Sequence, residues 1–305
     1  MRSAPAAGLA VLRTHVTVSQ LSSSMAPLSA GLLGPGDPPP FEVFHAAGRA
    51  RALLVCDHAS RAVPRVLASL GLPVEASWRH IAWDIGAAEL ARALSTRLDA
   101  PAVLAGYSRL VVDCNRQLED PSCFLRFSDG QRVPGNEHLA PDERRARAGA
   151  CYEPYHKAIA ARLHDYGQRG IVPALIAVHS FTSVLGTRPR PWQVGILWDQ
   201  DGRIALPLLE RLRAERGLVV GDNEPYSGRH PSDYTVDRHA ESAGLPHVCL
   251  EVRQDELLTP AGVARWAELL GRALADILAD ESLYAVFGAH AAHTAHSAHA
   301  APRRP

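Results

Sequence analysis

Short apolar runs alternate with amphipathic helical segments along most of this 305-residue chain, and this alternation constrains the fold more than any other feature. The runs are only about four or five residues long and rich in Val, Leu and Ile, as fully buried strands are. Strands that alternate with helices form a largely parallel sheet with helices on both faces. We therefore predict a single α/β domain built on a mixed, mostly parallel twisted sheet of about eight strands.

The expected elements follow from these runs and from helix-terminal signals. Strands are predicted over 52–56, 102–105, 110–114, 174–178, 194–198, 218–220 and 248–252. Helices are predicted over 85–98, 141–166, 204–216, 232–243 and 259–279. The last of these begins with Thr259 as its cap and Pro260 in its first position, and Gly244 ends the one before it.

The two ends of the chain differ in composition from the region between them. Residues 1–40 are rich in Ala, Ser, Leu, Gly and Pro, and residues 288–305 form a low-complexity His/Ala tail. We predict a disordered extension over 1–40, with Met25 as an alternative start, and a folded domain over 41–287. Both flanks are expected to be dispensable. The tail is either a loose metal-binding segment or a product of repeat slippage.

Charge and cysteine usage limit the partners and the compartment. The 32 Lys and Arg residues balance the 32 Asp and Glu residues, so the formal net charge is zero and no general attraction to nucleic acid or anionic membrane is expected. No apolar run is long enough to predict a transmembrane helix. The five cysteines are an odd number, and three lie inside apolar runs, so we predict buried, reduced thiols and a cytoplasmic protein.

Polar side chains lie at or near the ends of four predicted strands. In chain order they are His58, Asn115, Arg116, His179, Glu251 and Arg253. In open α/β sheets, ligands bind outside the carboxyl ends of the strands. We therefore expect these side chains to share one functional site at that edge of the sheet.

Two histidines and one carboxylate, with a fourth position open, are the pattern of a catalytic zinc site. His58 and His179 are the predicted imidazole ligands, but the chain has no His-Glu-x-x-His motif and no His-x-x-Glu pair at His58. Asp84, directly before a predicted helix, is either the third ligand or a helix N-cap. Asp57 is expected to point away from the site, because neighbours in a strand alternate.

The remaining polar groups suggest a hydrolytic mechanism. Glu251 is available as a general base toward the attacking water, the alternative being a buried ion pair with Arg253. Arg116 offers a planar guanidinium to a substrate carboxylate, with Asn115 beside it as an amide donor; the alternative is an ion pair with an acidic neighbour.

Two further groups of polar residues can be explained either by a role in the fold or by a role in the site. The segment 223–228 is either a Pro/Gly turn or a second part of the site. Tyr152, Tyr155 and His156 lie at helical spacing, which favours a place in the core or on the helix surface.

Together these motifs resemble the N-formylglutamate amidohydrolase family, which shares its fold with the zinc carboxypeptidases. The resemblance spans roughly residues 42–280 and is carried by short segments in order. These are 57–60 with 62–64, 83–87, 108–116, 179–181, 223–228, and His239 with 244–247 leading to 251–255.

The resemblance implies a zinc-dependent hydrolase with one Zn²⁺ per chain, whose catalytic domain covers 41–287. It would cleave the amide of an N-formyl or N-acyl amino acid, such as N-formyl-L-glutamate in histidine degradation, to formate and the free amino acid. By similarity with the wider fold, Asn115 and Arg116 would hold the substrate's α-carboxylate. Arg109 is the expected catalytic cation for the oxyanion, with Arg253 as an alternative. The other expected substrate contacts are Ser180, Asn223, Tyr226, His239 and Arg253.

Two other functions stay open: another carboxypeptidase-like amidase or deacylase, or a non-catalytic metal-binding protein loaded through the histidine tail. Glu251 separates enzyme from binder, since binding needs the metal ligands but no base. The predicted partner is a small, carboxylate-bearing N-acyl amino acid, and the sequence does not predict an oligomeric state.

Overall fold

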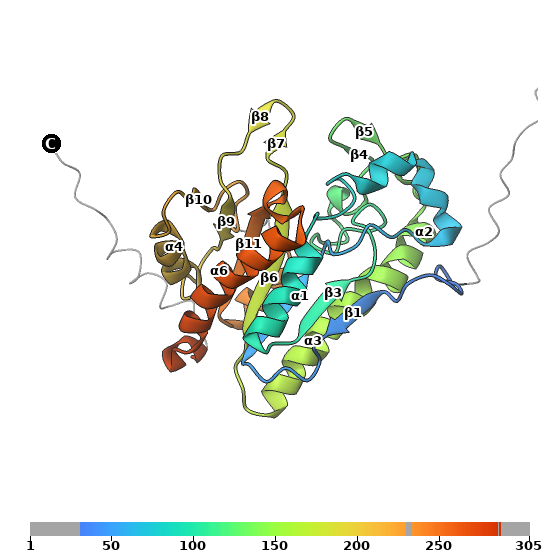
Figure 1. Cartoon of the computed structure of the whole chain (residues 1–305). Coiled ribbons are helices and arrows are strands. Elements are labelled where there is room, and N and C mark those ends of the chain that lie inside the picture. The colour runs from blue at the N-terminus through green and yellow to red at the C-terminus, as the bar shows by residue number, and fades with distance from the viewer. Residues whose placement is uncertain (1–30, 230–233, 286, 288–305) are drawn as a thin grey trace, which may run out of the picture.

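A seven-stranded sheet forms the centre of the molecule in the computed structural model, which describes residues 31–229, 234–285 and 287 (Figure 1). Its strand order is β1 (Phe41–Phe44), β3 (Ala102–Ala105), β2 (Ala52–Cys56), β6 (Ala174–Phe181), β11 (His247–Arg253), β9 (Val194–Leu197) and β10 (Val220–Asp222). The sheet is mostly parallel; β1 with β3 and β11 with β9 are the antiparallel pairs. The predicted α/β class is confirmed.

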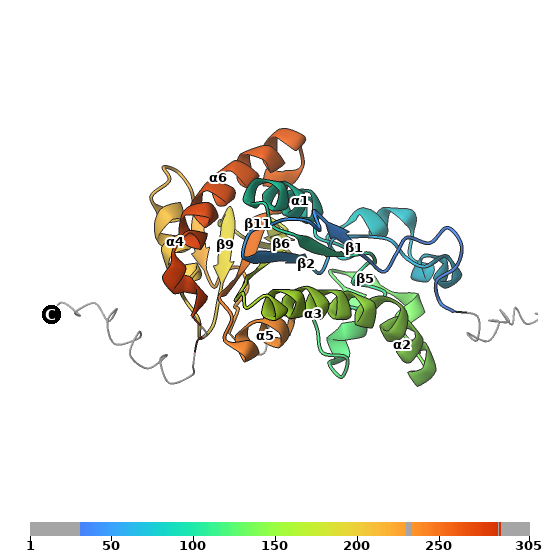
Figure 2. The same ribbon diagram turned by 90° about the horizontal axis from the view of Figure 1, so that it is seen from below.

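Helices cover both faces of this sheet (Figure 2). One face carries α1 (Ala87–Leu98), α4 (Ala205–Arg213) and α6 (Pro260–Leu278). The other carries α3 (Glu153–Gln168) and α5 (Tyr234–His239), with α2 (Pro141–Arg147) leading into α3. The burial of both faces explains why the strands read as continuous apolar runs rather than alternating ones.

The inner strand β2 shows how the sheet divides the interior into two cores. Ala52, Leu54 and Cys56 join the cluster beneath α1, α4 and α6. Leu53 and Val55 point the other way and join the cluster beneath α3. All five are fully buried, so the strand ends that emerge from this sheet are held rigidly.

The structure corrects the strand predictions at three places, one of which is the strand predicted over 218–220, which lies at β10, Val220–Asp222. Residues 110–114 are not a strand but a buried turn, in which the Val111 amide donates to the Ser108 carbonyl (2.9 Å). Most of these residues are apolar because they are buried, as the residues of a strand would be. Among the described residues their backbone has no neighbouring strand to bond with, and the side chain of Asn136 donates to the Leu110 carbonyl instead (2.9 Å). The edge strand β1 was not expected from the sequence, because its residues are only partly buried.

The predicted helix over 141–166 is interrupted. A π-helical turn, Ala148–Tyr152, separates α2 from α3. Pro154 lies in the first turn of α3 and has no N–H to donate, so a regular α-helical ladder cannot run through this point. By contrast, the cap at α6 is confirmed: the Gly262 amide donates to Thr259 Oγ1 at 3.1 Å.

The described fold starts before the predicted boundary at residue 41. Leu32 is buried against the core, and the main chain of Pro39 lies so close to Gly106 that a Cβ there would stand 2.1 Å from the Pro39 oxygen. Residues 1–30, residues 232–233 of one predicted helix, and the tail 288–305 lie outside the described residues.

Two general expectations can be compared with the described residues. All five cysteines are free and buried, as predicted. No helix in the described part of the chain is long and apolar enough to cross a bilayer.

Candidate active site

A cavity of about 290 Å³ opens at the carboxyl ends of the parallel strands. Most of the predicted site residues line it, namely His58, Asp84, Arg109, Asn115, Arg116, His179, Ser180, Tyr226 and Glu251. They come from segments far apart in the chain, so the fold brings the predicted motifs together at one place. Two short hairpins, β4–β5 (Phe127–Ser128, Gln131–Arg132) and β7–β8 (Val184–Leu185, Arg188–Pro189), project beyond this edge of the sheet (Figure 1).

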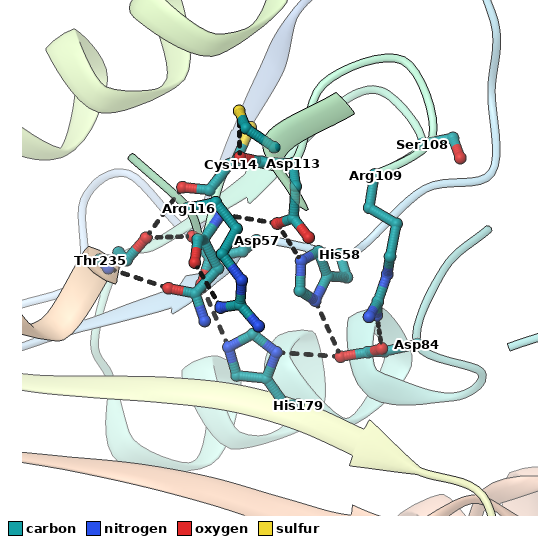
Figure 3. A network of polar contacts seen from close by, with 12 residues as sticks. Asp57, His58, Asp84, Ser108, Arg109, Asp113, Cys114, Arg116, His179 and Thr235 are labelled. Atoms are coloured by element: carbon teal, nitrogen blue, oxygen red, sulfur yellow. Dashed lines mark hydrogen bonds and ion pairs between the residues drawn. The ribbon is translucent and has the colours of Figure 1, made fainter. Parts of the chain in front are cut away.

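His58 and His179 point their rings at one carboxylate, that of Asp84 (Figure 3). Oδ2 of Asp84 lies 3.3 Å from Nδ1 of His58 and 2.9 Å from Nδ1 of His179. All three residues are at least 95% buried. Their ligand atoms lie within 4.8 Å of one another, which is close enough to share one metal ion.

A second carboxylate stands behind each imidazole. Nε2 of His58 lies 2.8 Å from Asp113, and Nε2 of His179 lies 3.1 Å from Asp57. Ionised carboxylates only accept hydrogen bonds, so in the tautomer that carries the ring proton on Nε2 each ring donates to the carboxylate behind it. A neutral imidazole of this tautomer has its lone pair on Nδ1, the atom that faces Asp84.

This arrangement fits a cation. In this tautomer two Nδ1 lone pairs and a carboxylate oxygen face one another, and like partial charges at such distances repel unless a positive charge lies between them. The outer carboxylates match the carboxylate–histidine–metal triads that orient imidazole ligands in metalloproteins. We conclude that His58, Asp84 and His179 have the donor set and the orientation of a two-histidine, one-carboxylate metal site.

The ionisation of these groups agrees with that conclusion. Burial, reinforced by the charge of Arg109, lowers the pKa of His58 to about 4, so its ring is neutral near pH 7 and can act as a ligand. Burial opposes the charge on Asp57, but the hydrogen bond from His179 prevails and lowers the pKa of Asp57 to about 2. Both outer carboxylates are therefore ionised, since the pKa of Asp113 is also held well below its usual value by His58 against the effect of burial.

Asp84 reaches the histidines because the helix that follows it starts late. Helix α1 begins at Ala87, and its cap residue, Gly86, has a φ of 80°. A Cβ on Gly86 would lie 2.4 Å from Leu257, so both the backbone angle and the close packing require glycine. No side chain caps α1, and the alternative that Asp84 is a helix N-cap is wrong.

Two neighbours hold the Asp84 carboxylate in place. Arg109 pairs with Oδ1 of Asp84, and the backbone amide of Ser180 donates to Oδ2 at 3.3 Å. The Ser180 hydroxyl donates to the carbonyl of Ile85 at 2.8 Å, which ties the Asp84 loop to β6. Arg109 therefore lies beside the histidine pair, as Figure 3 shows.

Glu251 stands next to His179 across the sheet. The two residues are in register on the parallel strands β11 and β6, and Gly195 is in register with Glu251 on the other side. Residues abreast on adjacent strands share a face, so the carboxylate and the imidazole project into the same cavity. Glu251 is 6% exposed.

A polar network fixes Asn115 and Arg116 in the wall of the cavity. Oδ1 of Asn115 accepts from the Thr235 amide at 2.9 Å, and Arg116 donates from Nη1 to the Asn115 carbonyl at 2.8 Å. The Thr235 hydroxyl donates to Asp57 at 2.6 Å. The wall that carries Arg116 is thus linked to the carboxylate behind His179.

Three predicted site residues do not line the cavity. Oδ1 of Asn223 accepts from the backbone amides of Trp198 (3.1 Å) and Gly228 (2.8 Å), so it shapes the loop that carries Tyr226. His239 is buried against His156 on the α3 side of the sheet. Arg253 pairs with Asp255 at 2.7 Å.

Sequence reasoning missed Asp113 and misjudged Asp57. The expectation that Asp57 points away is wrong, because β2 ends at Cys56 and strand alternation no longer applies at the next residue. Asp113 was hidden inside the run mistaken for a strand. The one available signal was that each is an acidic residue inside or beside an apolar run, where a charge needs a partner.

Comparison with known proteins identifies the family of the chain. The model of the N-formylglutamate amidohydrolase family matches residues 50–258. The gene product Atu2144 of Agrobacterium tumefaciens is 35% identical with a TM-score of 0.77, over 81% of this chain and 99% of that one. An N-formylglutamate amidohydrolase from Ralstonia eutropha JMP134 is 19% identical with a TM-score of 0.63, over 79% and 98% of the two chains, and so shares the fold. Among curated proteins, none matches the chain.

Proposed function

Since the chain belongs to the N-formylglutamate amidohydrolase family, we propose that it is a zinc-dependent hydrolase that releases formate from an N-formyl amino acid such as N-formyl-L-glutamate. One observation carries the metal-dependent part of this proposal: both imidazoles turn Nδ1 toward Asp84 while separate carboxylates hold Nε2. One zinc per chain, held by His58, Asp84 and His179, would polarise the amide carbonyl and lower the pKa of water.

The chain's own residues supply the proton transfers. Glu251 is the general base: its carboxylate takes a proton from water as the water oxygen bonds to the formyl carbon. The carbon–nitrogen bond then breaks, and the same proton passes from Glu251 to the leaving nitrogen. Formate and the free amino acid are the products. The position of Glu251 beside His179 supports this role.

The other residues bind and orient the substrate. Arg116 and Asn115 would hold the α-carboxylate, since a guanidinium suits the planar geometry of that group. Arg109 contributes positive charge near the developing oxyanion while it positions Asp84. Ser180 keeps the Asp84 loop against the sheet.

The test is an activity screen of the zinc-loaded protein on N-formyl and N-acetyl amino acids, with formate and acetate measured separately. We expect formate release from at least one N-formyl amino acid. Acetate release alone would make the protein a deacylase of the same fold. Zinc binding with no turnover on any member of the panel would favour a metal-binding protein.

Glu251→Gln tests the general base directly. The change keeps the shape of the side chain and removes its basicity, so kcat should fall by about 10²–10⁴ while zinc content stays unchanged. The exposed Glu210→Gln is the matched control and should behave as wild type. A near-wild-type rate in Glu251→Gln would place the base elsewhere, and loss of zinc would make Glu251 a metal ligand.

A further inference from the structure

Arg190 is a buried cation, and among the described residues its side chain has one hydrogen-bond partner, which belongs to the cavity wall. It follows β8 directly and is 8% exposed. Its Nη1 donates to the Tyr226 hydroxyl at 2.9 Å, and its guanidinium stands 4.7 Å from the centre of the Tyr226 ring and 5.9 Å from that of Phe181. Within the described residues, no carboxylate forms an ion pair with it.

A second buried arginine shows what a purely structural one looks like. Arg147 is 3% exposed, and its guanidinium donates to the Val111 carbonyl, the Asn136 side chain and the Gly135 carbonyl, none of which lines the cavity. In the part of the chain that the structure describes, Arg190 has one such acceptor, and it belongs to the cavity. A buried charge without an anion is costly, so a ligand that brings a negative charge to this wall would be favoured.

The hydrogen bond also fixes the direction of the Tyr226 hydroxyl. A guanidinium can only donate, so the phenolic oxygen is the acceptor in this contact and its own proton remains to be donated. Tyr226 lines the cavity and is 43% exposed, whereas His179 and Glu251 at its base are 3% and 6% exposed. The hydroxyl is therefore placed to meet a part of the substrate away from the bond that breaks.

We infer that Arg190 and Tyr226 select an N-acyl amino acid whose side chain is negatively charged: Tyr226 donates to the side-chain carboxylate, and Arg190 is the positioning residue behind it. This inference rests on the proposed function and assigns the second carboxylate of the substrate, because Arg116 serves the first. A cation behind a neutral donor strengthens that donor's hydrogen bond to an anion.

The experiment compares kcat/KM for N-formyl-L-glutamate and its neutral isostere N-formyl-L-glutamine. A hydrogen bond to a charged group corresponds to a factor of about 10 or more, so wild type should prefer glutamate by at least that factor. Tyr226→Phe and Arg190→Met should each reduce the preference to about threefold or less, and Arg190→Lys should restore part of it. The double variant should be no less selective than either single one.

Arg188→Met, on the same hairpin and exposed, is the matched control and should keep the wild-type preference. A purely structural role for Arg190 would lower the rates on both substrates equally and leave their ratio intact, which would overturn the inference. So would a wild-type enzyme that hydrolyses both substrates equally well.

A binding measurement separates this inference from the proposed function. Calorimetric titration with glutarate and with its monoamide, glutaramate, requires no turnover. If no N-formyl amino acid is cleaved, the proposed function fails, but tighter binding of glutarate than of glutaramate that is lost in Arg190→Met still supports the inference. Equal affinities, or no binding of either compound, would overturn it.

Discussion

Two pairs of buried histidines lie on this fold, and their hydrogen bonds differ in a way that separates a metal site from a polar core. In the first pair, His58 and His179, Nε2 of each ring lies against its own carboxylate and Nδ1 turns toward Asp84. In the second pair, His156 and His239, the rings bond to each other at 2.9 Å.

The ring nitrogens that bond within the second pair need no metal ion, because their partners are the other ring and the backbone. Nε2 of His156 lies 3.0 Å from the Cys114 carbonyl, which can only accept, so His156 donates there and accepts from His239 through Nδ1. Burial lowers the pKa of His156 to about 4 and that of His239 to about 3, so both rings are neutral. No carboxylate completes a ligand set around them among the described residues. Burial is thus common to both pairs, and of the two pairs only the first shares a carboxylate that could complete a metal site in the described part of the chain.

The largest expected effect comes from removing a ligand of the first pair. His58→Ala or His179→Ala should lose bound zinc and reduce kcat/KM by about 10³ or more, because the ion carries the electrostatic stabilisation of the reaction. Metal content is measured by elemental analysis on protein that ends at Phe287, to exclude the histidine tail. His239→Ala is the matched control and should keep its zinc. Full zinc occupancy in both His58→Ala and His179→Ala would remove the distinction between the pairs.

An intermediate effect is expected from the carboxylates behind the first pair. Asp57→Asn and Asp113→Asn keep the shape but weaken the orientation of the rings, so zinc affinity should fall by about 10–100-fold. Competition with a chelator measures it. Asp99→Asn is the control. Asp99 also bonds a histidine, His45, at 2.8 Å, but this pair is partly exposed and is not part of the cavity. Unchanged affinity in both Asp57→Asn and Asp113→Asn would show that the outer carboxylates serve the fold alone.

The smallest effect should come from the second pair, and it should appear in stability. His156→Phe leaves the Cys114 carbonyl and Nε2 of His239 without their partner, which costs about 1–3 kcal/mol in the free energy of unfolding. Denaturant unfolding measures this cost. Zinc content should stay at the wild-type level, and a loss of zinc at unchanged stability would reverse the roles assigned to the two pairs.

The sequence could predict the first pair but not the outer parts of its network. His58, His179 and Glu251 were found because each follows or ends a short apolar run, and strands of a parallel sheet bring their ends to one edge. Asp84 was found as one of two alternatives, and only the late start of α1 at Ala87 decides between them.

The remaining parts depend on irregular backbone, which hydrophobic periodicity does not describe. Asp113 lies in a buried turn whose side-chain pattern imitates a strand, and Asp57 follows the last residue of β2 in a turn. Arg190 belongs to a hairpin with two-residue strands, and its contact with Tyr226 joins segments 36 residues apart. Such contacts are set by tertiary packing, so they emerge only once the fold is known.

The most direct test of the metal site is an anomalous-difference map, measured at the zinc absorption edge, from crystals of the zinc-loaded protein. The geometry predicts one strong peak between Nδ1 of His58, Nδ1 of His179 and the carboxylate of Asp84, at distances of about 2.0–2.2 Å from these atoms. A map without a peak there, or with its peak at His156 and His239 instead, would contradict the account.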